Sequence, residues 1–126
     1  MSQIKLNVET KTQKYPIYIG KKISANISQI TKYNSIKFNR CLLVVDSNVP
    51  KKFVSIIKKS LKNKMSYIYY FKANELNKNM NSINKILEIL LNKNFSRDDG
   101  LISVGGGITG DISGFAASLF KRDLNL

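Results

Sequence analysis

Three consecutive glycines, Gly105–Gly107, follow a short apolar run and could form a loop that binds an anion. We interpret the apolar run, Leu101–Val104, as a buried strand, and we expect a helix to start near Thr109. Glycine lets the backbone turn through positive φ and lets a ligand approach closely, because it has no Cβ. The free N–H groups and the dipole of the helix that follows favour a negative charge at this turn.

The glycine spacing by itself is a weak signal. Gly105, Gly107 and Gly110 satisfy the pattern G-x-G-x-x-G, but such turns also serve as plain corners between a strand and a helix. Asp111 falls in the first turn of the expected helix, where the dipole favours a carboxylate whether or not a ligand binds. The residues alone therefore leave both interpretations of the turn open.

The expected helix after the turn carries apolar or small side chains in every direction. Ile112, Phe115, Leu119 and Phe120 are large and apolar, while Gly114 and the run 116–118 are small. A helix without a polar face is typical of a buried helix. We therefore predict that this helix is covered on all sides.

Upstream, segments typical of strands alternate with segments typical of helices. Period-two alternation predicts a short strand over 4–8, and a second short strand over 15–20 follows after a polar turn. Apolar or aromatic runs predict strands over 41–46 and 67–71. Periodic apolar residues predict helices near 23–30, after Pro50, which would occupy the first helical position, and over 83–90. The buried face of the helix after Pro50 would consist of Phe53, Val54, Ile57 and Leu61. This alternation predicts an open α/β fold with a mostly parallel sheet, in which Leu101–Val104 is the central strand.

Polar residues follow two of the predicted strands, where open α/β sheets bind ligands. Asp46 and Asn48 come after the run 41–45, and Glu75 and Lys78 come after the run 67–71. Taken without their neighbours, Asp46 and Asn48 are best interpreted as turn and cap residues, and Glu75 and Lys78 as an exposed ion pair. The alternative interpretation is that they contact a ligand, because they lie just after the ends of strands.

The net charge of +13 raises the question of a polyanionic partner. The lysines are spread over every segment, and 18 Lys, 14 Asn and 16 Ile make up 48 of the 126 residues. These residue types have A/T-rich codons, so biased coding explains the lysines without nucleic acid. The single cysteine, Cys41, excludes an internal disulfide and favours a reducing, cytoplasmic location. No apolar stretch is long enough to predict a membrane span.

The run Gly105–Ser118, with the sequence GGGITGDISGFAAS, resembles the signature of the 3-dehydroquinate synthase family. The resemblance extends upstream to the segment 15–20, YPIYIG, to Asp46-x-Asn48, and to Glu75-x-x-Lys78, where Asn74 replaces the family's glycine. Because asparagine tolerates positive φ, we expect the turn at Asn74 to survive. The resemblance implies a Rossmann-like nucleotide-binding domain with an N-terminal β-hairpin, spanning residues 1–126.

The family's activity is an NAD- and metal-dependent conversion of 3-deoxy-arabino-heptulosonate 7-phosphate to 3-dehydroquinate and phosphate, in the shikimate pathway. By resemblance, the residues of this chain that contact NAD would be Asp46, Asn48, Glu75, Lys78, Gly105, Gly106, Gly107, Ile108 and Asp111. Arg122 would contact the substrate phosphate, and a guanidinium suits phosphate by its fork of donors.

The resemblance also implies partners and parts that lie outside this chain. The family takes its divalent metal ligands, for zinc or cobalt, from a helical C-terminal domain, and we expect the chain to end before that domain. The 126 residues alone are expected to be inactive, and to need that domain or a split partner chain. The family is often homodimeric. The alternatives are another sugar-phosphate cyclase or a metal-dependent polyol dehydrogenase of this fold, and, as the remotest, a basic nucleic-acid-binding module without enzymatic activity.

Overall fold

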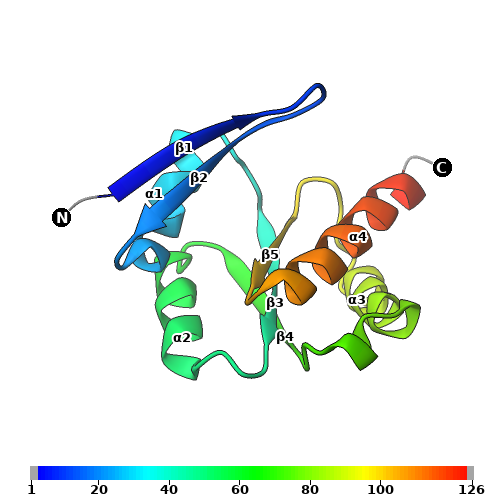
Figure 1. Cartoon of the computed structure of the whole chain (residues 1–126). Helices are drawn as coiled ribbons and strands as arrows, with labels where there is room; N and C mark the ends of the chain where they lie inside the picture. Colours follow the sequence, from blue (N-terminus) through cyan, green and yellow to red (C-terminus); the bar gives the residue numbers. More distant parts are fainter. Residues whose placement is uncertain (1–2, 125–126) are drawn as a thin grey trace.

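A computed structural model of the chain describes residues 3–124, and side chains only as far as Lys121. The elements in chain order are β1 (Gln3–Glu9), β2 (Lys14–Gly20), the 3-10 helix η1 (Ile23–Asn26), α1 (Ile27–Tyr33), β3 (Arg40–Asp46), α2 (Lys51–Ser60), β4 (Met65–Phe71), the 3-10 helix η2 (Glu75–Asn77), α3 (Met80–Asn92), β5 (Gly100–Val104) and α4 (Gly107–Leu124) (Figure 1). The predicted α/β fold with a parallel sheet and an N-terminal hairpin is confirmed.

The main sheet has three parallel strands in the order β4-β3-β5. Its centre is β3, because Val44 pairs with Tyr69 of β4 on one side and with Ser103 of β5 on the other. The prediction that Leu101–Val104 is the central strand is therefore wrong. Within residues 3–124, β5 pairs with β3 alone, and its residues are only half-buried or exposed. The continuous apolar run of β3, by contrast, is completely buried from Cys41 to Val45.

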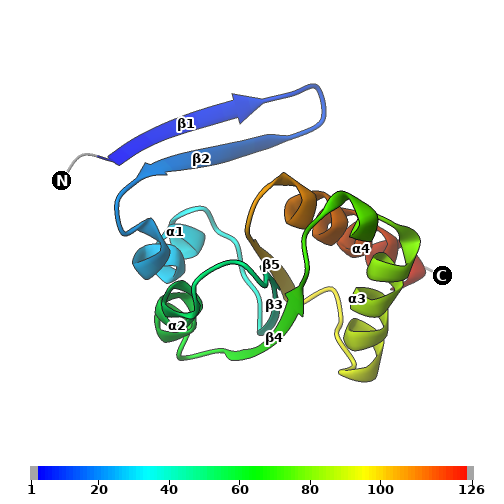
Figure 2. The same ribbon diagram turned by 60° about the horizontal axis from the view of Figure 1, so that its bottom comes forward.

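Helices cover both faces of the sheet (Figure 2). Leu42 and Val44 of β3 point into a core that they share with α3 and α4. Leu43 and Val45 point the other way, into a core that they share with α2. Because successive side chains of a strand alternate between its faces, one apolar strand supplies both cores.

The helix α2 differs from its prediction at two residues. Val54, Ile57 and Leu61 are buried as expected, but Phe53 is 42% exposed, because it lies at the margin of the stripe that these three residues form. Pro50 is the residue before the first helical position and not the first position itself. Its ψ of 136° keeps it outside the helix.

The prediction that the helix after the glycine turn is buried on all sides is wrong. Ile112, Ser113, Ala116 and Phe120 are buried, but the opposite face of α4 is exposed and consists of Gly110, Asp111, Gly114, Phe115 and Ser118. The reason is that α4 packs on α3 and on the sheet, and both lie on one side of it. The helix also begins at Gly107, two residues earlier than expected.

The hairpin of β1 and β2 forms a separate antiparallel sheet, and Lys5 pairs with Tyr18 in its register. It follows the predicted strands closely. The helix predicted near 23–30 is split into η1 and the short α1. Among the described helices, none has the length and apolar character that a membrane crossing requires.

Candidate nucleotide-binding site

The turn between β5 and α4 needs a glycine at its first position. Gly105 has a φ of 150°, and a Cβ there would lie 2.9 Å from Cβ of Asp46 and 3.0 Å from Oγ1 of Thr109. Residues with a side chain rarely adopt this φ; the first distance is shorter than real Cβ contacts, and the second is shorter than most of them. The absence of a side chain at Gly105 is therefore explained by packing within the chain. Among the described glycines, Gly105 alone has a positive φ, so the other two glycines of the run do not turn the backbone in that way.

Gly106 and Gly107 lie in open space. A Cβ on either residue would meet no atom within 4 Å. Gly110 N donates to Gly106 O over 3.1 Å, so helical hydrogen bonding begins at Gly106. The first N–H groups of an α-helix have no partner within the helix and carry the positive end of its dipole. The turn therefore presents N–H groups and an uncovered backbone on the side where a ligand can approach, with Ile108 half-buried beside it.

Asp46 lies next to this turn, at the carboxyl end of β3. Its Oδ1 accepts a hydrogen bond from Asn48 N at 3.0 Å, and its backbone O accepts one from Val49 N at 2.9 Å. These bonds show the turn-forming role that the residue types favour. Oδ2 of Asp46 takes no part in these bonds, and the exposed Asn48 lies at the same end of the sheet as the glycine turn.

Lys78 joins the segment after β4 to the start of α4. Its Nζ lies 3.2 Å from Oδ2 of Asp111, and both side chains are largely exposed. Glu75 belongs to η2 in the same segment, but Lys78 pairs with Asp111 and not with it. Asn74 has a φ of −156°, so the expected positive φ is absent; its Oδ1 instead caps η2 by accepting from Asn77 N at 2.9 Å.

The fold brings the nominated cofactor residues to one edge of the sheet. They follow the carboxyl ends of β3, β4 and β5, which are neighbours in a parallel sheet. The strand order changes direction at β3, because the next strand in the chain, β4, lies on one side of β3 and β5 lies on the other. In open α/β sheets, ligands bind at the carboxyl ends of the strands at such a point. Arg122 is in α4, but its side chain lies outside the described residues.

Sequence reasoning missed two hydroxyl groups beneath the turn. Thr109 is completely buried and Ser113 nearly so, and neither hydroxyl has a hydrogen-bond partner in the structure. Thr109 lies directly against Gly105. Their positions at i and i+4 on one helix face are readable from the sequence, but the burial of that face is not.

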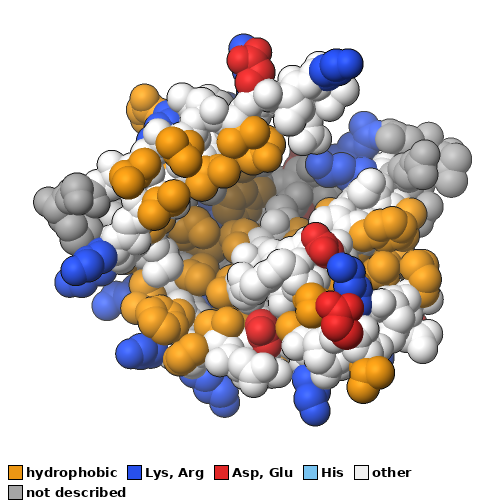
Figure 3. All heavy atoms as spheres, in the orientation of Figure 1, with side chains coloured by type: hydrophobic (Ala, Val, Ile, Leu, Met, Phe, Trp, Pro, Cys, Tyr) orange, Lys and Arg blue, Asp and Glu red, His pale blue; other side chains and the backbone are white. Residues whose placement is uncertain are grey.

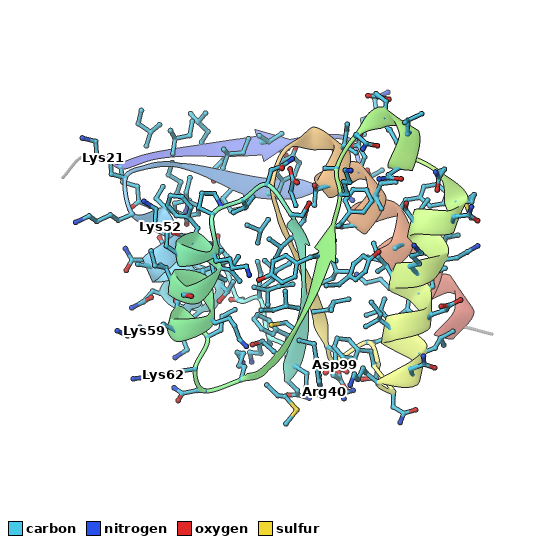
Figure 4. The ribbon with its side chains drawn as sticks, turned by 90° about the horizontal axis from the view of Figure 1, so that it is seen from below. Lys21, Arg40, Lys52, Lys59, Lys62 and Asp99 are labelled. Atoms are coloured by element: carbon cyan, nitrogen blue, oxygen red, sulfur yellow. The ribbon has the colours of Figure 1, made fainter. Side chains whose placement is uncertain are left out.

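Arg40 and Asp99 form an ion pair at the opposite, amino-terminal edge of the sheet (Figure 4). Arg40 Nη2 lies 3.0 Å from Asp99 Oδ2, and the guanidinium also donates to the carbonyl groups of Lys93 and Asn94 at the end of α3. Burial raises the pKa of the Asp99 carboxyl, but hydrogen bonds from Arg40 and from Ser96 N outweigh burial and hold that pKa below its usual value. The hydrogen bond to Asp99 likewise raises the pKa of Arg40. The pair lies at the edge away from the glycine turn and joins β3, α3 and the loop before β5.

These features define an open α/β domain with a glycine turn between a strand and a helix at the carboxyl ends of its parallel strands. Residues 68–126 match the family model described as 3-dehydroquinate synthase N-terminal. The chain is 55% identical over 124 residues to the 3-dehydroquinate synthase of Pelagibacter ubique, and this alignment covers 98% of the chain and 34% of that protein. It is 37% identical over 129 residues to the 3-dehydroquinate synthase of Buchnera aphidicola subsp. Cinara cedri, covering 95% of the chain and 33% of that protein.

The fold is also similar to solved structures. A crystal structure of 2-deoxy-scyllo-inosose synthase superposes with a TM-score of 0.80 at 21% sequence identity, covering 94% of this chain and 33% of that one. A second structure of an enzyme of that name, complexed with carbaglucose-6-phosphate, NAD+ and Co2+, superposes with a TM-score of 0.81. At this identity the two structures confirm the fold alone.

The resemblance to the 3-dehydroquinate synthase family is thereby confirmed: the chain is homologous to a 3-dehydroquinate synthase over nearly all of its own length. It spans about a third of the length of the curated relatives that it matches.

Proposed function

We propose that this chain is the NAD-binding part of a 3-dehydroquinate synthase, a cytoplasmic lyase that converts 3-deoxy-arabino-heptulosonate 7-phosphate to 3-dehydroquinate and phosphate. The observation that supports it best is the 55% identity to a named synthase, over a stretch that includes every nominated site residue. One structural neighbour with the same fold, a 2-deoxy-scyllo-inosose synthase, is described as a complex with NAD+. The remaining two-thirds of such an enzyme would complete the site.

The described residues fit a dinucleotide. Gly106 and Gly107 leave room for a pyrophosphate against the start of α4, where N–H groups and the helix dipole stabilise its charge. Asp46 and Asn48 offer an acceptor and an amide to ribose hydroxyl groups beside that turn. When bound, NAD would accept a hydride from a substrate carbinol and later return it.

Lys78 and Asp111 are proposed to contact this ligand. Their ion pair is exposed, so its Coulombic energy is small and can be exchanged for contacts with ribose or phosphate. Arg122 is proposed to hold the substrate phosphate, because a guanidinium can donate two parallel hydrogen bonds to it.

The described residues do not fit the metal. No three His, Cys, Asp or Glu side chains of the part described here come together as a metal ion requires. We derive no step through a metal from these residues, and the ligands of the proposed enzyme would come from the rest of its polypeptide.

The cofactor assignment is tested by replacing Gly106 with Val and titrating NAD calorimetrically. A side chain at Gly106 meets nothing in the ligand-free chain, so the fold is expected to survive, while the branched side chain occupies the space of the pyrophosphate. We expect NAD affinity to fall at least about tenfold, which corresponds to roughly 1.4 kcal/mol. Gly114→Ala, on the helix that follows Gly106 and equally open, is the control and should bind like the wild type. Equal NAD affinity for Gly106→Val and wild type would reject the assignment.

The substrate is tested in a chimaera that joins this chain to the remaining two-thirds of the Pelagibacter ubique relative. We expect phosphate release from 3-deoxy-arabino-heptulosonate 7-phosphate with NAD and zinc present, and none from a hexose 6-phosphate. The reverse preference would favour a different sugar-phosphate cyclase. The 126-residue polypeptide assayed alone is expected to release no phosphate, because it corresponds to only a third of the length of the relatives named 3-dehydroquinate synthase.

A further inference from the structure

A cavity of about 380 Å³ lies at the amino-terminal edge of the main sheet. It is lined by side chains from α1, from the loop that joins α1 to β3, and from Lys64. Asn39 and Lys64, both in the lining, immediately precede Arg40 and Met65, the paired first residues of β3 and β4. The glycine turn follows the other, carboxyl end of the sheet, so this cavity is separate from the proposed nucleotide site.

The wall of this cavity carries positive charge without an acid to balance it. Lys32, Lys37 and Lys64 line it, and none of the described lining residues is Asp or Glu. Within residues 3–121, the lysines that form ion pairs are Lys14 and Lys78, and neither belongs to the cavity. On the face seen in Figure 3, by contrast, Lys and Arg side chains are spread out and do not gather in one patch. A cavity lined by one sign of charge concentrates counter-ions, so this one favours an anion.

The fold holds Lys64 in place at this cavity. The residue is half-buried, and its Nζ donates to Phe38 O at 2.6 Å and lies 4.6 Å from the centre of the Phe38 ring. An ammonium group has three N–H donors, so this hydrogen bond leaves two for a ligand. A partly buried charge is costly unless it is paired, and an anion in the cavity would supply the missing partner.

Ser35 adopts a backbone conformation at the end of α1 in which glycine is usual. Its φ is 58°, its N donates to Lys32 O at 3.1 Å, and Ile36 N donates to Thr31 O at 2.9 Å. This pair of bonds is a Schellman motif, whose left-handed residue is most often glycine. These bonds also occupy carbonyl groups at the end of α1 that would otherwise repel an anion. A serine at this position is unfavourable for the backbone, but it brings a hydroxyl group to the wall of the cavity.

We propose that the cavity binds a phosphate group through Lys32, Lys37 and Lys64, with the hydroxyl groups of Ser28 and Ser35 as further donors. A phosphate group carries up to two negative charges and several strong acceptor oxygens, so it can contact donors from three segments at once. Lysine binds phosphate as a point charge and needs no planar geometry. The proposal depends neither on the nucleotide site nor on Arg122.

The test is a titration of the 126-residue chain with sodium phosphate at about pH 7.5, where phosphate is mostly a dianion. Amide NMR spectra at constant ionic strength follow it, because screening alone changes with added salt. We expect the amide resonances of Ser35 and Asn39 to shift saturably, with half-saturation at on the order of 1 mM, an affinity typical of a small ligand held by a few contacts.

Charge-removing variants locate the site. Lys64→Gln should raise the dissociation constant at least about fivefold, because it removes a charged donor. Lys37→Gln, at an exposed position, repeats the test without touching the hydrogen bond to Phe38. Lys62→Gln is the matched control: it removes the same charge two residues from Lys64, outside the lining and on the side of the molecule seen in Figure 4, and should bind like the wild type.

A second titration, with phenyl phosphate, separates two sources of the phosphate group. Phe38 and Ile36 give the cavity an apolar wall, against which the body of a phosphate ester could pack. Binding of phenyl phosphate that is tighter than that of inorganic phosphate assigns the cavity to a phosphate ester, and equal or weaker binding assigns it to free phosphate.

Three results overturn the proposal. The first is the absence of saturable shifts up to about 20 mM phosphate, well above the expected half-saturation. The second is equal weakening of binding by Lys62→Gln and Lys64→Gln, because the net charge of +13 would then explain it. The third is a set of shifts confined to Gly106 and Gly107, because phosphate would then occupy the glycine turn and not this cavity.

Discussion

Gly105 is close to Asp46 and Thr109, whereas the next residue, Gly106, has open space around the position of its missing side chain. The first glycine serves the folding of the turn, since a Cβ would meet neighbouring atoms at 2.9 and 3.0 Å. The second has no such reason within the described chain. Substitutions at these two adjacent positions therefore separate folding from binding.

We predict that Gly105→Ala lowers the free energy of unfolding by about 2–4 kcal/mol, from the positive φ and the close contacts together. Gly106→Ala should change it by no more than about 0.5 kcal/mol, as is usual for an exposed position. Urea unfolding followed by circular dichroism measures both. Equal stabilities of the two variants would contradict the packing explanation for Gly105.

Asp99 makes the free energy of unfolding depend on pH in the acidic range. Its folded pKa lies below the ordinary value, so its ion pair with Arg40 contributes stability above the unfolded pKa of about 3.9. That contribution is lost as the pH falls from the unfolded pKa through the folded pKa, because over this range the unfolded state binds more protons than the folded one and protonation favours unfolding.

Asp99→Asn is therefore expected to be less stable than the wild type at pH 6, and this difference should narrow toward pH 3. The measurement is the urea midpoint at the two pH values. Asp98→Asn, at the exposed neighbouring residue, is the control and should show a small difference that does not change in this way. A gap between wild type and Asp99→Asn that widens in acid would rule out the assigned role.

At the scale of elements, α4 has a glycine in its interior that the described chain does not explain. Gly114 is exposed, has a helical position, and would place a Cβ in open space. Glycine in the middle of a helix costs roughly 0.5–1 kcal/mol relative to alanine. Gly114→Ala should accordingly raise the free energy of unfolding by that amount.

The same urea titration checks this prediction. Ser118→Ala, one turn further along the exposed face, is a comparison with a smaller expected gain, because serine is a better helix former than glycine. A Gly114→Ala variant that is less stable than the wild type would show that something in the isolated chain requires the glycine.

The strands show which element-level predictions the sequence supports. The hairpin strands and the buried run of β3 follow their hydrophobic patterns, because periodicity is a local property of the chain. The position of β5 at the edge of the sheet does not follow from its apolar run. Edge and centre differ by which strands pair, and pairing is decided by long-range contacts.

At the scale of the whole molecule, positive charge is spread over the surface with few acids to balance it. The stretches between Glu9 and Asp46, and between Asp46 and Glu75, contain no acidic residue. Lys52, Lys59 and Lys62 lie along one side of the molecule together with Lys21 (Figure 4). Such a surface opposes the compact state by self-repulsion, and salt screens that repulsion.

We predict that raising NaCl from about 20 to 300 mM increases the free energy of unfolding by on the order of 1 kcal/mol. The added salt shortens the Debye length and so screens the repulsion between lysines. Urea unfolding at about 1 µM chain keeps any association between chains from contributing to this effect. The double variant Lys59→Gln/Lys62→Gln should be less sensitive to salt. Destabilisation of the wild type by NaCl would contradict the prediction.

The sequence by itself determined the class of fold, the order of its elements and the resemblance on which the proposed function depends. Those features are carried by short-range patterns: apolar runs, helical periodicity, and the unbroken signature from Gly105 to Ser118. The sequence also supplied the set of candidate cofactor residues, from Asp46 to Asp111, although their contacts with NAD stay a prediction.

The tertiary structure decided which of these patterns are buried and which side chains meet. It placed β3 at the centre of the sheet, paired Lys78 with Asp111, and left one face of α4 and several large apolar side chains of the hairpin exposed. A helix or hairpin with apolar residues is covered only where another element packs on it. That depends on how distant segments assemble in space, which no local pattern in the chain records.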